Sequence, residues 1–83
     1  MPSRLPPVSG REVVSLLEKL GYQSVRQRGS HLRLRKITEV GEHSITVPVH
    51  KVVAIGTLND ILSRVSLWNG VSKQTLIDML KKV

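Results

Sequence analysis

The chain has 83 residues, with 13 Lys and Arg against 6 Asp and Glu, so its formal net charge is +7. A chain of this length forms one small domain with a single thin core. Because the sequence has no cysteine, it excludes a disulfide framework, a thiolate nucleophile and a cysteine-based zinc site.

No segment of the sequence is typical of export or membrane insertion. Residues 1–8 contain three prolines and no apolar stretch, so we expect an extended lead-in rather than a signal peptide. The longest apolar run, residues 52–55, is far shorter than the ~20 residues that span a bilayer. We therefore expect a soluble, cytoplasmic protein without membrane contact, folded as one domain over residues 9–83.

The first predicted element is an amphipathic helix that begins after Ser9. Ser9 and Glu12 have the spacing of a capping box, in which each side chain accepts a hydrogen bond from the other residue's backbone N–H. Gly21 can adopt the left-handed backbone conformation that ends a helix. The inward positions follow at a spacing of three or four and are Val13, Leu16, Leu17 and Leu20.

Two strands are expected next, joined by a tight turn. Residues 22–28 are compatible with a strand, and Gly29 and Ser30 follow it as a turn signal. From His31 the sequence alternates strictly between apolar and basic residues. Leucines occupy one face and basic side chains the other: Leu32 and Leu34 against His31, Arg33 and Arg35.

A third strand is expected over residues 44–49, after a connection at residues 38–42. Its inward side chains would be Ile45, Val47 and Val49. Pro48 has no backbone donor, so it should lie on an edge strand or at a bulge. Together the three strands make an antiparallel meander.

Two helices complete the predicted order. Thr57 is expected to cap the first, and residues 68–70 to end it. Ser72 is expected to cap the second, with Val71 packed against its first turn. The inward positions would be Leu58, Ile61, Leu62 and Val65, then Leu76, Ile77, Leu80 and Val83. Helix, three strands, helix and short helix predict an α+β fold, with the helices on one face of a three-stranded antiparallel sheet.

Basic residues gather on the solvent-facing side of the predicted sheet. Five lie within the eleven positions from Arg26 to Lys36, four of them arginine, and no acid interrupts them. Arginine suits bidentate contact with phosphate, which indicates a nucleic-acid partner. Since Tyr22 and Trp68 are the only aromatic residues, and Trp68 is expected in the core, we expect contacts to phosphate and shape rather than base stacking.

Other interpretations of the basic residues stay open. They could form a solvated strand face that discourages edge pairing, or a docking surface for an acidic protein. A DNA-binding helix-turn-helix in the last two helices is less favoured, because residues 66–72 form a longer connection than the usual 3–4 residues.

His31 is the candidate catalytic residue. It directly follows the turn and projects onto the basic face, and imidazole titrates near pH ~6.5, which suits proton transfer at a ribose hydroxyl. His43 and His50 are the other candidates, with His50 in a supporting position at the end of the third strand. Three scattered histidines with few carboxylates nearby make a poor metal site, so we expect no metal and no cofactor.

Five segments resemble the HicA (YcfA-like) toxin family. They are SGREVV at residues 9–14, LEKLGY at 17–22, VRQRGSH at 25–31, VPVH at 47–50 and GTL at 56–58. The resemblance covers nearly the whole stretch from Ser9 to Leu80, and its most diagnostic part is the Gly-Ser-His turn followed by a strand. Leu32 and Leu34 stand where many members carry a second histidine and an aromatic residue, and residues 38–42 and 67–70 look longer than usual.

The resemblance implies a double-stranded-RNA-binding-domain-like fold and a toxin that acts as a metal-independent endoribonuclease on mRNA. It also implies neutralisation by a HicB antitoxin that covers the active site, and it assigns the catalytic role to His31. The residues expected to bind RNA are Arg26, Arg28, Gly29, Ser30, Arg33, Arg35, Lys36 and His50.

On this hypothesis His31 takes the proton from a ribose 2′-hydroxyl, which attacks the adjacent phosphate and leaves a 2′,3′-cyclic phosphate end. Arg28, Arg33 and Arg35 would stabilise the charge that builds on the phosphate oxygens. The alternative is a non-catalytic RNA-binding module of the same fold. In either case we expect the free chain to be a monomer.

Overall fold

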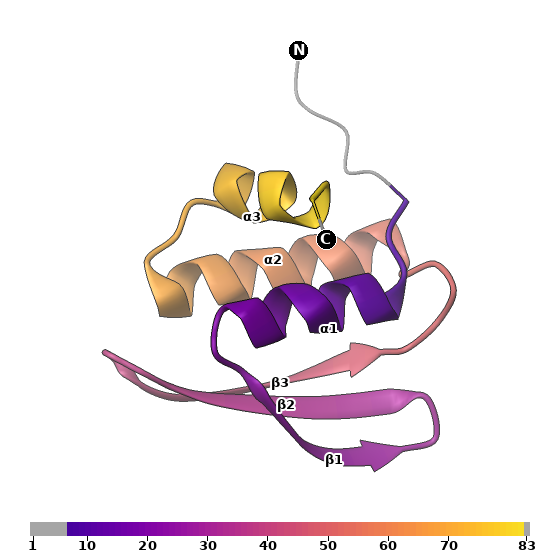
Figure 1. Cartoon of the computed structure of the whole chain (residues 1–83), viewed down its shortest axis with the longest axis horizontal. Coiled ribbons are helices and arrows are strands. Elements are labelled where there is room, and N and C mark those ends of the chain that lie inside the picture. The colour runs from indigo at the N-terminus through magenta and orange to yellow at the C-terminus, as the bar shows by residue number, and fades with distance from the viewer. Residues whose placement is uncertain (1–6, 83) are drawn as a thin grey trace.

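The computed structural model describes residues 7–82 and has the predicted order of elements (Figure 1). The elements are α1 (Gly10–Lys19), β1 (Gln23–Arg28), β2 (His31–Thr38), β3 (Gly41–Pro48), α2 (Ile55–Asn69) and α3 (Lys73–Leu80). In Figure 1 the three helices lie on one side of the sheet, and the other side is left open. The α+β prediction is therefore confirmed. Val83, expected to point inward, lies outside the described residues, as do residues 1–6.

Helix α1 begins as the sequence predicts. The Ser9 N–H donates to Glu12 Oε1 at 3.1 Å, and the Glu12 N–H donates to Ser9 Oγ at 3.1 Å, so both halves of the capping box are present. Val8, assigned to the lead-in, is instead buried, and its carbonyl accepts a hydrogen bond from the Val53 N–H at 2.7 Å. Val8 therefore packs with the core instead of forming part of an extended lead-in.

The sheet is an antiparallel meander in the order β1-β2-β3. The longer connection expected at residues 38–42 is wrong, because Thr38 pairs with Gly41 across a two-residue turn. Thr38 Oγ1 donates to the Gly41 carbonyl and accepts from the Val40 N–H, which closes this turn. Gly41 has a φ of 130°, a backbone conformation that lets β3 start directly after the turn. Pro48 is the last residue of an edge strand, as expected.

The start of α2 differs from the prediction, whereas its end lies within the predicted residues 68–70. The helix begins at Ile55 with Ala54 as its N-cap and no side-chain cap, so Thr57 lies in the first turn and does not cap it. Its last residue is Asn69, and the C-cap is Gly70, whose φ of 62° is left-handed. The predicted cap of α3 is confirmed, since Ser72 Oγ accepts from the Thr75 N–H at 3.1 Å.

The core lies between the helices and the inner face of β2 and β3. Leu34 and Val47 are fully buried there, whereas every residue of β1 is exposed. Helix α1 approaches the end of β3 closely at Gly10, where a Cβ atom would overlap the Pro48 carbonyl oxygen. This contact holds the end of β3 against the start of α1. Within residues 7–82, no helix has the length and apolar character needed to cross a membrane.

Candidate functional site

Strand pairing aligns basic side chains in rows across the open face of the sheet. Residues directly opposite each other in an antiparallel ladder project from the same face. Arg28 pairs with His31, and one row further along Arg26 pairs with Arg33. Arg33 in turn pairs with Thr46 on β3. These side chains line a hollow of about 230 Å³, which we call the arginine hollow: Arg26, Arg28, His31, Arg33 and Thr46.

The turn between β1 and β2 sets this alignment. Gly29 and Ser30 form a two-residue turn in which Gly29 has a φ of 54°, so Arg28 and His31 face each other directly. Further along β1, a β-bulge leaves Val25 without a partner in the ladder. The regularly paired rows that form the arginine hollow therefore lie between this bulge and the β1–β2 turn.

The arginine hollow has an excess of positive charge that no acidic side chain within residues 7–82 pairs with. Within residues 7–82 the ion pairs are Arg35 with Glu42 at 3.7 Å and Arg64 with Asp60 at 3.0 Å, and neither includes an arginine of the hollow. Arg26 and Arg33 lie directly opposite each other, an arrangement of like charges that destabilises a sheet. An anion between the two guanidinium groups would remove this repulsion, and phosphate matches their geometry.

Two of the predicted basic residues lie outside the hollow. Arg35 is exposed on the same face but lies one row further along, next to Glu42. Lys36 faces the helices, where its ammonium group donates to Asn69 Oδ1 at 2.6 Å. Strand alternation thus separates Lys36 from the arginines, and the expectation that it continues their surface is wrong.

Ser30 and His50 meet beside the turn. Ser30 Oγ and His50 Nε2 are 3.2 Å apart, and the Val49 N–H donates to the Ser30 carbonyl at 2.6 Å. His50 is exposed, and its carbonyl accepts from the Gly10 N–H at 2.9 Å. The end of β3 and the start of α1 therefore hold the residue that immediately precedes His31.

His43 is a core residue and is unsuited to the catalytic role considered for it. The residue is 6% exposed, its ring stacks on Trp68 with centroids 4.9 Å apart, and its Nδ1 lies 2.6 Å from the Tyr22 hydroxyl. Burial, and secondarily the charge of Arg64, lowers the pKa of His43. Burial also raises the pKa of Tyr22, which the hydrogen bond from Asn69 partly offsets.

These residues form a polar network that the sequence analysis did not identify. Asn69 Nδ2 donates to the Tyr22 hydroxyl at 3.0 Å and to the Val65 carbonyl at 2.8 Å, while Asn69 Oδ1 accepts from Lys36. The available signal was the alternation of β3, which puts His43 on the same inward face as Ile45 and Val47.

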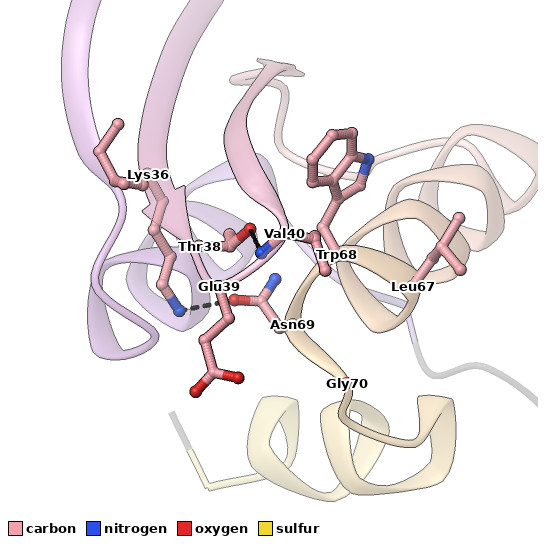
Figure 2. Close-up of a pocket in the computed structure, with 9 residues that line it drawn as sticks. Lys36, Thr38, Glu39, Val40, Leu67, Trp68, Asn69 and Gly70 are labelled. Atoms are coloured by element: carbon pink, nitrogen blue, oxygen red, sulfur yellow. Dashed lines mark hydrogen bonds between the residues drawn. The ribbon is translucent and has the colours of Figure 1, made fainter.

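A second hollow, of about 310 Å³, lies between the β2–β3 turn and the end of α2. Figure 2 shows the hydrogen bond between Lys36 and Asn69 beside it, with Trp68 and Leu67 on the α2 side. Its exposed apolar side chains include Ile37, Val40 and Leu67. It contains no histidine and one carboxylate, from Glu39, so its lining offers little acid–base chemistry. Within residues 7–82, no group of three or more His, Asp or Glu is placed to hold a metal ion.

Comparison with known proteins identifies a family for this chain. A family model described as the HicA toxin of bacterial toxin-antitoxin systems matches residues 10–67. The matched residues include all five that line the arginine hollow, and α3 lies beyond them. Searches of curated proteins and of solved structures found no match.

Proposed function

The chain belongs to the HicA toxin family of bacterial toxin–antitoxin systems, and from this premise we propose that it is a metal-independent endoribonuclease that cleaves mRNA at the arginine hollow. The observation that carries the proposal is the alignment of one imidazole, His31, with three guanidinium groups that have no acidic partner within residues 7–82. A phosphodiester supplies the missing negative charge.

In the proposed reaction, His31 is the general base. The unprotonated imidazole takes the proton of a ribose 2′-hydroxyl, and the oxygen attacks the adjacent phosphorus. The bond between phosphorus and the 5′-oxygen breaks, and the imidazolium or water protonates that oxygen. The products are a 2′,3′-cyclic phosphate and a 5′-hydroxyl end. One general base contributes ~10²–10⁴-fold, so we expect a slow nuclease.

The arginines would stabilise the negative charge that grows on the phosphate oxygens. Arg26, Arg28 and Arg33 would contact the reacting phosphate, because guanidinium groups bind such oxygens in bidentate fashion. Arg35, one row away, would contact a neighbouring phosphate. Lys36 faces the helices, so we leave it out of the proposed RNA surface.

The turn residues would support the same site. Gly29 has no side chain and would let the RNA backbone come close, while Ser30 and His50 would hold the turn through their hydrogen bond. Leu32 is partly buried on the helix side of the sheet. The proposed mechanism therefore uses His31 alone, without a second histidine at the next position.

An antitoxin of the HicB type would neutralise this toxin by covering His31. The open face lacks a protein cover within residues 7–82, and its charge suits an acidic surface as well as RNA. RNA and antitoxin would then compete for the arginine hollow.

The test compares the native chain with His31→Ala on a long single-stranded RNA in excess EDTA. We expect cleavage by the native chain alone, with equal melting temperatures for the two proteins, because His31 is exposed and packs against nothing in the core. Equal cleavage by both proteins would point to a contaminant or another residue. Binding of RNA by both proteins, without cleavage by either, would support the non-catalytic module instead.

A further inference from the structure

The arginine hollow contains one side-chain hydroxyl, that of Thr46. This residue is exposed on β3 and pairs with Arg33, which pairs with Arg26 on the far strand. One row therefore offers two guanidinium groups and a hydroxyl, each from a different strand. All three side chains can donate hydrogen bonds, and only Thr46 does so without adding charge.

We propose that Thr46 is a substrate-binding residue whose hydroxyl donates a hydrogen bond to a non-bridging oxygen of the phosphodiester held by Arg26 and Arg33. The inference rests on the proposed function, which it deepens. A hydrogen bond from a hydroxyl to an ionised phosphate oxygen is short and strong compared with one between neutral groups. Threonine also has few side-chain rotamers, so little freedom is lost when it binds.

The position of Thr46 would orient the phosphate relative to His31. The row of Thr46 and the row of His31 are two residues apart along β2, or about 6.6 Å. A ribose hydroxyl that is hydrogen-bonded to His31 could bridge this separation to a phosphorus atom in the next row. The Thr46 hydroxyl would select which phosphate oxygen faces β3, and so which side of the phosphorus faces the attacking oxygen.

A purely structural role for Thr46 is the competing explanation, because threonine is common in strands. Thr46→Val separates the two, since it keeps the branched shape and removes the hydroxyl. Thr46→Ser keeps the hydroxyl and removes the methyl group. Ser44→Ala is the matched control, because it removes a hydroxyl from the same face of the same strand, opposite Arg35 and outside the hollow.

The experiment measures kcat and KM on an oligoribonucleotide, and the Kd for the same sequence made of DNA, which has no attacking hydroxyl. For Thr46→Val we expect kcat/KM to fall by about 10- to 100-fold, the range for a lost hydrogen bond to a charged group, with weaker DNA binding and an unchanged melting temperature. Thr46→Ser should retain most activity, and Ser44→Ala should match the native chain.

The outcomes separate this inference from the proposed function. If the native chain cleaves RNA and Thr46→Val cleaves and binds equally well, the inference is overturned alone. An equal loss in Ser44→Ala, or a loss in Thr46→Ser as large as that in Thr46→Val, would also overturn it. If the native chain does not cleave but Thr46→Val loses DNA affinity, the phosphate contact stands and the nuclease proposal fails. Should Thr46→Val fail to fold, Thr46→Ser against Thr46→Ala provides the same comparison.

Discussion

His43 shows how a single buried side chain ties the stability of this protein to pH. The Tyr22 hydroxyl lies 2.6 Å from His43 Nδ1 and also accepts a hydrogen bond from Asn69. Protonating His43 would place a positive charge in the core. Burial and Arg64 accordingly lower its pKa in the folded chain.

We predict that the native chain loses stability as the pH falls below ~6.5, the ordinary pKa of an unfolded histidine. The unfolded chain takes up the proton first, so the contribution of His43 is complete above that pH and is lost as the pH falls through the lowered folded pKa. Melting temperatures between pH 7.5 and pH 5 would show this slope, and His43→Gln should flatten it. An equal slope in both proteins would show that His43 is not the source of the pH dependence.

Repulsion between the paired arginines of the hollow lowers the free energy of unfolding of the RNA-free chain. Arg26 and Arg33 repel each other across two strands, so we expect Arg33→Gln to stabilise the RNA-free chain by about 0.2–1 kcal/mol at low salt. The gain should shrink at high salt, because salt screens exposed charges.

Urea unfolding at two salt concentrations measures this effect, together with RNA affinity, which should fall in the same variant. Arg35→Gln is the control, because Arg35 lies beside Glu42 and should give no such gain. If Arg33→Gln destabilised the chain at low salt, the proposed repulsion between Arg26 and Arg33 would be wrong.

Among the elements, α1 and β3 make a close backbone contact beside the segment that holds the turn before His31. A Cβ at Gly10 would overlap the Pro48 carbonyl oxygen and lie 2.6 Å from Val49 Cα. Both obstacles are backbone atoms, so the elements themselves would have to move apart. The displaced segment includes Val49 and His50, which hold the turn before His31.

We therefore predict that Gly10→Ala destabilises the chain by about 1–3 kcal/mol or more, the range for forced overpacking. Gly56→Ala is the matched control in the first turn of α2, where a Cβ would meet nothing within 4 Å; it should stabilise by up to ~1 kcal/mol, because alanine is the better helix former. Urea unfolding of the two variants provides the comparison. A Gly10→Ala chain as stable as the native one would show that α1 and β3 can separate freely.

The order of the elements could be predicted from the sequence, whereas several boundaries could not. The capping box of α1 and the alternation of β2 depend on local spacing, and both are confirmed. The connection predicted between β2 and β3 was longer than the turn in the structure. The turn is short because the Thr38 side chain closes it and Gly41 tolerates the strained backbone. The start of α2 was misplaced because Ala54 caps it without a side-chain bond.

Part of the candidate site could be predicted, and the remainder depends on how the strands pair. Alternation was enough to bring His31 and Arg33 to one face, but Lys36 was predicted to continue that surface, and the structure turns it towards the helices. Thr46 was missed because a lone threonine in a strand has no distinguishing pattern. It becomes visible once the pairing with Arg33 is known, and that pairing depends on the exact length of the β2–β3 turn.

For the whole molecule, the uneven distribution of the +7 charge has a measurable consequence. Each phosphate contact made to single-stranded RNA should contribute about −0.7 to the slope of log K against log salt concentration. We predict that Arg28→Gln makes this slope shallower by about 0.7, while Lys36→Gln leaves it unchanged because Lys36 faces the helices.

Fluorescence anisotropy with a short labelled RNA that carries 2′-O-methyl groups measures the slope without cleavage. Melting temperatures of both variants check that each is folded. Equal slopes for Arg28→Gln and the native chain would remove Arg28 from the RNA surface, and a shallower slope for Lys36→Gln would extend that surface onto the helix side.

The decisive measurement is the mass of the new RNA ends after incubation of an oligoribonucleotide with the purified chain in excess EDTA, alongside His31→Ala. We predict 2′,3′-cyclic phosphate and 5′-hydroxyl ends from the native chain, and intact RNA with His31→Ala. A single 2′-deoxy nucleotide on the 5′ side of the scissile bond should also block cleavage there, because it removes the attacking oxygen. Intact RNA with the native chain, or the same ends produced by His31→Ala, would contradict the proposal that this toxin cuts RNA through His31.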